Sequence, residues 1–302
     1  MKQSTFLLVV LGVMAGLVAL TCAGVLLLLT GRWNPIPRTV SIVLTYEVVG
    51  TGGQQPAPAD MEQLVTAIDR RVNPGWPRRA VVRDVGGRVE VGVYGDDPAV
   101  AERIDRILSA IGTLEFRVLA TTRKLEYAKY IARAKLLSEK ETELKDEAAG
   151  ERLAFWVPVQ GVNALQRFVA DPTLATREVA KPEGKQFQVL VVDDPSDVTG
   201  AFLTRVKPGV DSRLRPAVEF SFNAAGAQRF GALTGSHLPD PQDDFYYLLG
   251  IILDGKVQSA PSIRSAIFGS GVIEGDFTQR EVEDLVDVLN AGPLPVAIKR
   301  VD

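Results

Sequence analysis

The longest feature in the hydropathy pattern is an apolar segment near the start of the chain. Between Phe6 and Thr30 there is no charged residue. About 25 such residues can cross the ~30 Å hydrocarbon core of a bilayer with some tilt. The apolar part of a cleavable signal peptide is shorter, about 7–15 residues. We therefore predict an uncleaved transmembrane anchor at 6–30, after a short tail at 1–5.

The single cysteine, Cys22, lies inside this segment. A lipoprotein would use it as the modified residue, but Thr21 stands where a small Gly or Ala is expected, and the apolar run continues beyond it. We favour a membrane-buried cysteine without a special role. The rest of the chain has no thiol and so forms no internal disulfide.

After the anchor, the hydrophobic spacing alternates between the periods of strands and helices. Residues 40–119 follow the order β-α-β-β-α-β, which is the ferredoxin-like arrangement. The pattern predicts strands at 40–49, 80–84, 88–94 and 113–119, and helices at 60–72 and 97–111. We expect Asp60 with Gln63 to cap the first helix, and Asp97 with Pro98 to open the second.

The segment 122–150 is crowded with Lys, Glu and Arg. Its apolar positions are sparse, at Ile131, Leu137 and Leu144, and we predict one long charged helix. It could be a mobile arm for a partner, but we favour a solvated surface helix.

The remainder is again mixed α and β. We expect strands at 187–192, 217–222 and 271–275, and a hairpin turning at Asp254-Gly255. Asn223 is expected to cap one helix. Thr278 with Glu281 forms a capping box for another, which ends at Gly292.

Composition excludes some classes of function. Hydrophobic residues make up 46% and charged residues 24%, with a net charge of −3, as in ordinary globular proteins. Lys and Arg are scattered and form no basic stripe, so we do not expect a nucleic-acid-binding protein.

Two acidic groups are the best candidates for metal ligands. Asp193, Asp194 and Asp197 form one, and Asp240, Asp243 and Asp244 form the other. Carboxylates suit Ca²⁺, but the spacing is not that of an EF-hand, and we favour solvated loops.

His237 is the single histidine and lies in a Gly-Ser-His-Leu-Pro segment. We favour a surface residue over a general base. The sequence therefore gives no catalytic, cofactor-binding or metal-binding residues and predicts that the chain is not an enzyme. Aromatic candidates for binding an unfolded chain are Phe187, Phe202, Phe220, Phe222 and Phe245, although we favour a core position for each.

Several motifs resemble one family, in its order, over nearly all of residues 40–298. The segment LGIILDGKVQSAP, from Leu249 to Pro261, looks like the characteristic hairpin of SecD. Further similar stretches are GVIEGDFT at 271–278, LVDVLNAGPLP at 285–295, GTLEFR at 112–117, FNAAGAQRF at 222–230 followed by Leu233-Thr234, and VTG at 198–200.

SecD is an accessory membrane subunit of the bacterial Sec protein-export machinery, and the resemblance covers its first transmembrane helix and first large extracytoplasmic domain. It implies an α+β fold with a ferredoxin-like base and an inserted head that holds emerging polypeptide. We expect 40–119 as the first part of the base, 120–270 as the head, and 271–298 as a strand and helix returning to the base. It also implies a cytoplasmic tail at 1–5 and an extracytoplasmic C-terminal domain, anchored by a single pass in the inner membrane.

The chain also departs from the family. SecD continues into five more membrane helices, whereas this chain ends at Asp302, and Val40–Val43 stands where the family has a Gly-rich DLxGG motif. We expect that the chain cannot by itself drive translocation with a proton gradient.

Two hypotheses follow from the resemblance. In the first, the domain binds exported polypeptide, or the translocase through SecD, SecF or a SecY-type channel. An unfolded segment would pair with a strand edge or lie in an apolar groove between head and base. In the second, it assembles with a full-length SecD or another envelope protein and does not touch substrate. The polypeptide-binding residues stay unassigned, and no cofactor is expected.

Overall fold

The structure is a computed structural model, and it describes residues 39–49, 57–160, 166, 168–182, 184–240, 242 and 245–301. The expected tail, anchor and Cys22 lie outside these residues. Within the described part of the chain, no helix is long and apolar enough to cross a bilayer.

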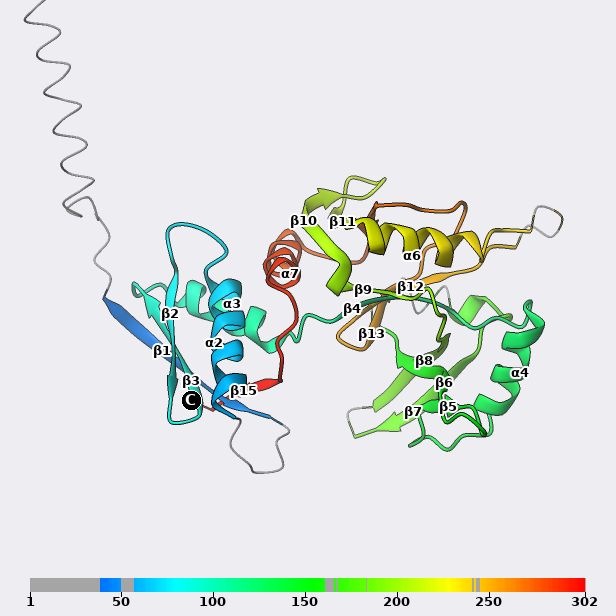
Figure 1. Ribbon diagram of the computed structural model, residues 1–302, viewed down its shortest axis with the longest axis horizontal. Helices are drawn as coiled ribbons and strands as arrows, with labels where there is room; N and C mark the ends of the chain where they lie inside the picture. Colours follow the sequence, from blue (N-terminus) through cyan, green and yellow to red (C-terminus); the bar gives the residue numbers. More distant parts are fainter. Residues whose placement is uncertain are drawn as a thin grey trace, which may run out of the picture.

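The first part of the fold, here called the base, is a four-stranded antiparallel sheet with two helices packed against it (Figure 1). Its strands run in the order β15-β1-β3-β2, which gives the β-α-β-β-α-β path of the ferredoxin-like motif. Its elements are β1 (Val40–Val48), α2 (Pro58–Val72), β2 (Ala80–Val85), β3 (Arg88–Tyr94), α3 (Pro98–Ser109) and β15 (Ile298–Arg300).

The predicted fourth strand of the base is wrong. Residues Leu114–Val118 form β4, which pairs with β12 and β9 outside the base, and β15 takes the edge position beside β1. After α3 the chain turns at Gly112, where φ is +84°. The alternate side chains of β4 then enter a separate hydrophobic core.

Three of the four predicted helix caps are confirmed. Asp97 accepts a hydrogen bond from Ala99 N, Asn223 accepts one from Gly226 N, and Thr278 forms the capping box with Glu281. The cap predicted at Asp60 is wrong: α2 begins at Pro58, without a side-chain cap. Proline is well suited to a first helical turn, since its missing N–H has no partner there.

The second part, here called the head (residues 113–291), contains three further sheets. Their orders are β13-β12-β4-β9, β10-β11-β14 and β5-β6-β8-β7. The bounds are β5 (Glu143–Lys145), β6 (Arg152–Pro158), β7 (Thr176–Lys181), β8 (Gly184–Val192), β9 (Val198–Thr199), β10 (Leu203–Val210), β11 (Pro216–Phe222), β12 (Leu249–Leu253), β13 (Lys256–Ser259), β14 (Ser270–Ile273), and helices α4 (Leu125–Ala134), α6 (Ala224–Gly235) and α7 (Gln279–Ala291).

The predicted long helix at 122–150 is also wrong. Only α4 is helical; the chain then turns, and Glu143–Lys145 adds a strand to β6. The Glu141 carboxylate accepts hydrogen bonds from the backbone N and the hydroxyl of Ser138, which favours a turn over a continuing helix. Beyond it, buried Leu144 between exposed Glu143 and Lys145 has the period of a strand.

The predicted return of 271–298 to the base begins later than expected. Strand β14 pairs with β11 in the head, and the apolar face of α7 belongs to the head core through Val282, Leu285, Val286 and Leu289. Val288 packs instead into the base core. Helix α7 therefore lies between head and base and contacts both (Figure 1).

Candidate functional site

A cleft of about 470 Å³ opens where α3, the β12–β13 hairpin and α7 meet. Its apolar residues are Ile107, Ala110, Leu253, Phe277, Leu285 and Val288. Its polar and charged residues are Arg106, Ser109, Gln160, Asp254, Lys256, Gln258, Glu281 and Asp284. The cleft thus combines apolar surface with side chains of both charges, and base and head each contribute to it.

Asp254 fixes the hairpin to the segment that leaves the base. One carboxylate oxygen accepts hydrogen bonds from the backbone N atoms of Gly112 and Thr113, each at 2.8 Å, and the other accepts from Ile111 N at 3.1 Å. Asp254 N donates back to Thr113 O at 2.9 Å. The sequence predicted a turn at Asp254-Gly255, but it did not reveal this second role.

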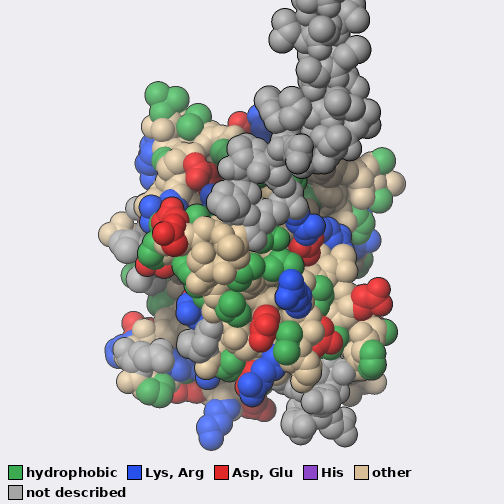
Figure 2. All heavy atoms as spheres, turned by 90° about the vertical axis from the view of Figure 1, so that its left-hand side faces the viewer, with side chains coloured by type: hydrophobic (Ala, Val, Ile, Leu, Met, Phe, Trp, Pro, Cys, Tyr) green, Lys and Arg blue, Asp and Glu red, His purple; other side chains and the backbone are tan. Residues whose placement is uncertain are grey.

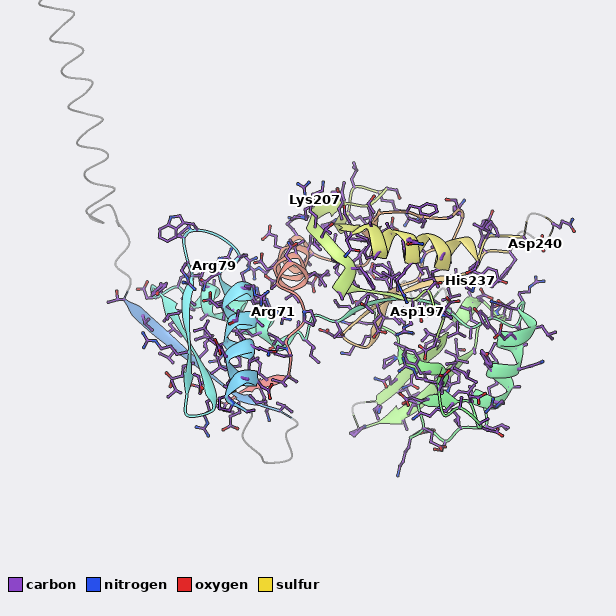
Figure 3. All side chains as sticks on the ribbon, viewed as in Figure 1. Arg71, Arg79, Asp197, Lys207, His237 and Asp240 are labelled. Carbon is purple, nitrogen blue, oxygen red and sulfur yellow. The ribbon has the colours of Figure 1, made fainter. Side chains whose placement is uncertain are left out.

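Arg71 holds together the two crossings between base and head. This residue, in the last turn of α2, is fully buried. Its guanidinium donates to the carbonyl oxygens of Ile107 (3.1 Å), Gly292 (2.9 Å), Ala110 and Ile111. Burial lowers the pKa of Arg71 to about 10, with nearby Asp254 opposing the shift, so the side chain stays charged near neutral pH. Figure 3 places Arg71 on the side of the base that faces α7.

Sequence reasoning missed Arg71, because an arginine at the end of a helix is also the ordinary complement of the helix dipole. Three of its carbonyl partners lie together, 36 to 40 residues later in the chain, and the fourth, at Gly292, lies 221 residues later. No spacing rule could have brought them together.

Ion pairs join the polar face of α7 to the base. Asp284 contacts Arg103 Nε at 2.9 Å and Arg106 Nε at 3.0 Å, and Asp287 contacts Arg103 Nη2 at 3.0 Å and Arg79 Nη1 at 3.2 Å. Both carboxylates are largely shielded, with exposed side-chain fractions of 13% and 14%. The two apolar clusters on α7 and these pairs set how the head lies against the base.

In the first acidic group, Asp193 and Asp197 form ion pairs with arginines instead of lying free in solvent or binding a cation together. Arg117 forms ion pairs with Asp193 and Asp197, and Arg152 Nε contacts Asp193 at 2.6 Å. The prediction of a solvated loop is therefore wrong for these two aspartates. Burial raises the pKa of Asp197 to about 7, although a hydrogen bond from Asp194 N and the charge of Arg117 oppose the rise.

Asp240 of the second acidic group accepts a hydrogen bond from Gln242 N at 2.9 Å. Asp243 and Asp244 lie outside the described residues. Across the described ranges, no three His, Cys, Asp or Glu side chains lie together in a way that could hold a metal ion.

The surface position predicted for His237 is wrong, since the side chain is fully buried in the head. Its Nδ1 lies 2.8 Å from Leu233 O, so this nitrogen carries the proton, and Nε2 accepts from the Tyr127 hydroxyl at 2.7 Å. Burial lowers the pKa of His237, which keeps the ring neutral. Figure 3 shows it at the far side of the head from Arg71 and the base.

The aromatic candidates do not line the cleft. Phe220 and Phe222 pack with Phe116 and Phe230 in the head core, as favoured from the sequence, with ring centroids of Phe220 and Phe222 5.0 Å apart. Phe187 and Phe202 are partly buried against two hydrophobic clusters, and Phe245 meets Tyr247 edge to face. The aromatic residue of the cleft is Phe277.

Charges on the outer surface of the base are mixed. The face in Figure 2 shows basic, acidic and apolar side chains interspersed, with no extended area of one sign. This distribution agrees with the scattered Lys and Arg of the sequence.

Comparisons with known proteins identify the region that contains much of the cleft. Residues 175–296 match the model of the SecDF P1 head subdomain. The SecD translocase subunit of Rhodobacter capsulatus is 38% identical over 128 residues, which cover 42% of this chain and 22% of the relative. That of Elusimicrobium minutum is 42% identical over 106 residues, covering 35% and 21%. The chain thus spans about a fifth of the length of these relatives.

Two solved structures are similar in fold. A structure of SecDF, described as a membrane component that enhances protein export, superimposes with a TM-score of 0.55 at 24% identity, covering 86% of this chain and 98% of that one. A crystal structure of SecDF in a super-membrane-facing form gives 0.56 at 23% identity, covering 95% and 35%.

Proposed function

We propose that the chain acts in Sec-dependent protein export and holds exported polypeptide in the cleft between head and base, because residues 175–296 match the model of the SecDF P1 head subdomain and part of the chain is similar to SecD. The role is that of a non-enzymatic accessory component. We further propose that residues 6–30 anchor it in the inner membrane, with the described domain on the extracytoplasmic side.

The cleft is the observation that carries this proposal. Its volume of about 470 Å³ lies within the roughly 300–1,000 Å³ of typical binding sites. Its apolar residues can cover the side chains of an unfolded segment, and burying one large apolar side chain contributes about 1.5–3 kcal/mol. Its charged residues have both signs, which suits many different polypeptides better than one fixed acidic or basic ligand.

The connections around the cleft support a division of the chain into two parts. We place residues 40–112 and 292–301 in the base and 113–291 in the head. Arg71 donates to both crossings, and Asp254, which lines the cleft, accepts from the first of them. A chain bound in the cleft would therefore lie beside the junction of the two parts.

Photo-crosslinking in the intact cell envelope tests the proposal. A photoreactive phenylalanine at Ser109 or Gln258, both lining the cleft, is expected to capture many nascent exported chains. The same probe at exposed Ser212, in the β10–β11 turn, serves as the matched control and is expected to capture few. Capture of one fixed partner such as SecD, SecF or a SecY-type channel would contradict substrate holding and support the assembly hypothesis.

A blocking variant strengthens the test. Ser109→Trp places a bulky side chain at the edge of the cleft. We expect it to lower substrate crosslinking from Gln258 about five-fold, equivalent to ~1 kcal/mol of binding free energy. Ser212→Trp is expected to have no effect. Equal crosslinking in both variants would show that polypeptide does not enter the cleft.

A further inference from the structure

A second cleft, which shares Arg106 and Ile107 of α3 with the first, has a different chemistry. It measures about 300 Å³ and lies between α3, α7 and the residue that precedes β2. Four arginines line it: Arg79, Arg103, Arg106 and Arg280. We call it the arginine cleft.

The arginine cleft has more positive than negative charge. Among the described residues, Arg79, Arg103 and Arg106 share only two carboxylates, those of Asp284 and Asp287.

The remaining pair at the cleft adds no net charge. Exposed Arg280 forms no ion pair with a described residue, and Glu283 at the same rim offsets its charge while accepting a hydrogen bond from Gln279. The other three guanidiniums of the cleft face two carboxylates, which leaves a surplus of one positive charge. A partly enclosed cleft concentrates the field of such a surplus on a small anion.

Arginine is the residue type that best fits a phosphate. Its planar fork donates two parallel hydrogen bonds to a phosphate or carboxylate, and such charge-assisted bonds are about twice as strong as neutral ones. A single Nη or Nε atom of Arg79 and of Arg106 contacts the shared aspartates. Further donors of these side chains can therefore turn to a ligand.

The register of the base sheet places this cleft near the start of the described chain. Val40 lies opposite Tyr94, Thr39 O accepts from Gly95 N, and Arg79 O accepts from Tyr94 N. The β1 entry and the loop 73–79 therefore occupy the same end of the sheet, about two strand spacings or ~10 Å apart. Figure 3 shows Arg79 at the upper end of the base, where β1 also begins.

This end of the base can reach a bilayer if residues 6–30 form the anchor. Eight residues lie between Thr30 and Thr39, which makes nine steps along the chain, and an extended chain spans at most ~3.3–3.6 Å per step, or about 30 Å. The loop also presents Trp76, whose exposed fraction is 74%. Tryptophan is enriched at the headgroup level of membranes, where its ring is partly buried and its N–H is hydrated.

We propose that the arginine cleft binds a phosphate group, supplied by an anionic lipid headgroup at the membrane surface, with Trp76 in the interface beside it. The lipid source rests on the anchoring part of the proposed function, whereas the phosphate site rests on the cleft itself. Binding there would fix the base against the bilayer and orient the neighbouring polypeptide cleft.

A titration of the full chain in neutral maltoside micelles tests the proposal. Phosphatidylglycerol, phosphatidylcholine and inorganic phosphate are added separately, and binding is followed by the shift in the thermal unfolding midpoint. We expect phosphatidylglycerol to bind and Arg280→Gln to weaken its binding about five-fold, as for the loss of one partly exposed charge-assisted contact. The matched variant Arg213→Gln, at an exposed arginine of the head, is expected to bind as the parent does.

The arms of the titration separate the sources of phosphate. Binding of phosphatidylglycerol that Trp76→Ala weakens supports the lipid headgroup. Binding of inorganic phosphate that depends on Arg280 but not on Trp76 supports a phosphate site for a free anion. If neither ligand binds, or if Arg280→Gln and Arg213→Gln act equally, the proposal is overturned. Ser109→Trp tests the polypeptide cleft separately, because Ser109 lines that cleft and not the arginine cleft, so phosphate binding should stay unchanged.

Discussion

Replacing Arg71 by methionine tests whether one buried guanidinium joins the base to the head. Methionine has an unbranched side chain that can occupy part of the same space, but it donates no hydrogen bond. The carbonyl oxygens of Ile107, Ala110, Ile111 and Gly292 would lose their shared donor. The expected effect is therefore on the two crossings between the parts.

The magnitude follows from opposing contributions. Hydrogen bonds to a charged group contribute about 1.5–3 kcal/mol each, so four of them contribute roughly 8 kcal/mol. Against this stands the burial of the charge: lowering the pKa from 12.5 to about 10 corresponds to ~3 kcal/mol. Removing the charged member of a buried network costs about 3–5 kcal/mol in comparable cases, and we expect a loss in this range.

Differential scanning calorimetry of the full chain in neutral detergent measures the effect. A loss of 3–5 kcal/mol corresponds to a decrease of roughly 10 °C in the midpoint for a domain of this size. Arg70→Met is the matched control, since Arg70 is the exposed neighbour, and exposed substitutions usually change stability by less than ~0.5 kcal/mol. Arg71→Lys should fall between the two, because lysine keeps the charge without the planar fork.

The reasoning would be refuted if Arg71→Met and Arg70→Met shifted the midpoint equally. The contribution should also be independent of pH between 5 and 9, because Arg71 stays protonated throughout this interval when its pKa is about 10. A strong pH dependence of the difference between the two variants would likewise contradict it.

Two further predictions concern the ion pairs. Replacing both Asp284 and Asp287 by asparagine should destabilise the contact of α7 with the base by about 1–2 kcal/mol. The double variant should therefore be cleaved faster by proteases at the crossings than Glu283→Gln, which is the inert control. A double variant as resistant to proteolysis as the control would contradict this. Because burial raises the pKa of Asp197 to about 7, above its unfolded value, the folded state takes up a proton as the pH falls from 8 to 5. This proton uptake should increase the free energy of unfolding by as much as about 3 kcal/mol. The Asp197→Asn variant should lack this increase, which is measured from the thermal unfolding midpoints at pH 8 and pH 5. A pH dependence equal to that of the parent protein would contradict the assignment.

The position of α7 shows where sequence reasoning stops. Its apolar stripe, its capping box at Thr278 and its end at Gly292 were all predictable, since each depends on residues within one or two turns. Which face of α7 meets the base was not predictable, because Asp284 and Asp287 look like ordinary solvated positions. Their arginine partners lie about 180–210 residues earlier in the chain.

The sequence by itself determined the elements with strong local signals: the first three strands and both helices of the base, the tight turns, three of the helix caps, and the motifs that resemble SecD. Propensity and periodicity act over a few residues, and these features need nothing more. It could not determine that β4 leaves the base and β15 completes it. It also could not show that His237 is buried, that Arg71 donates to both crossings between base and head, or that four arginines line one cleft. Those depend on pairings between distant segments, where burial and hydrogen-bond satisfaction in the whole fold select one arrangement among several locally acceptable ones.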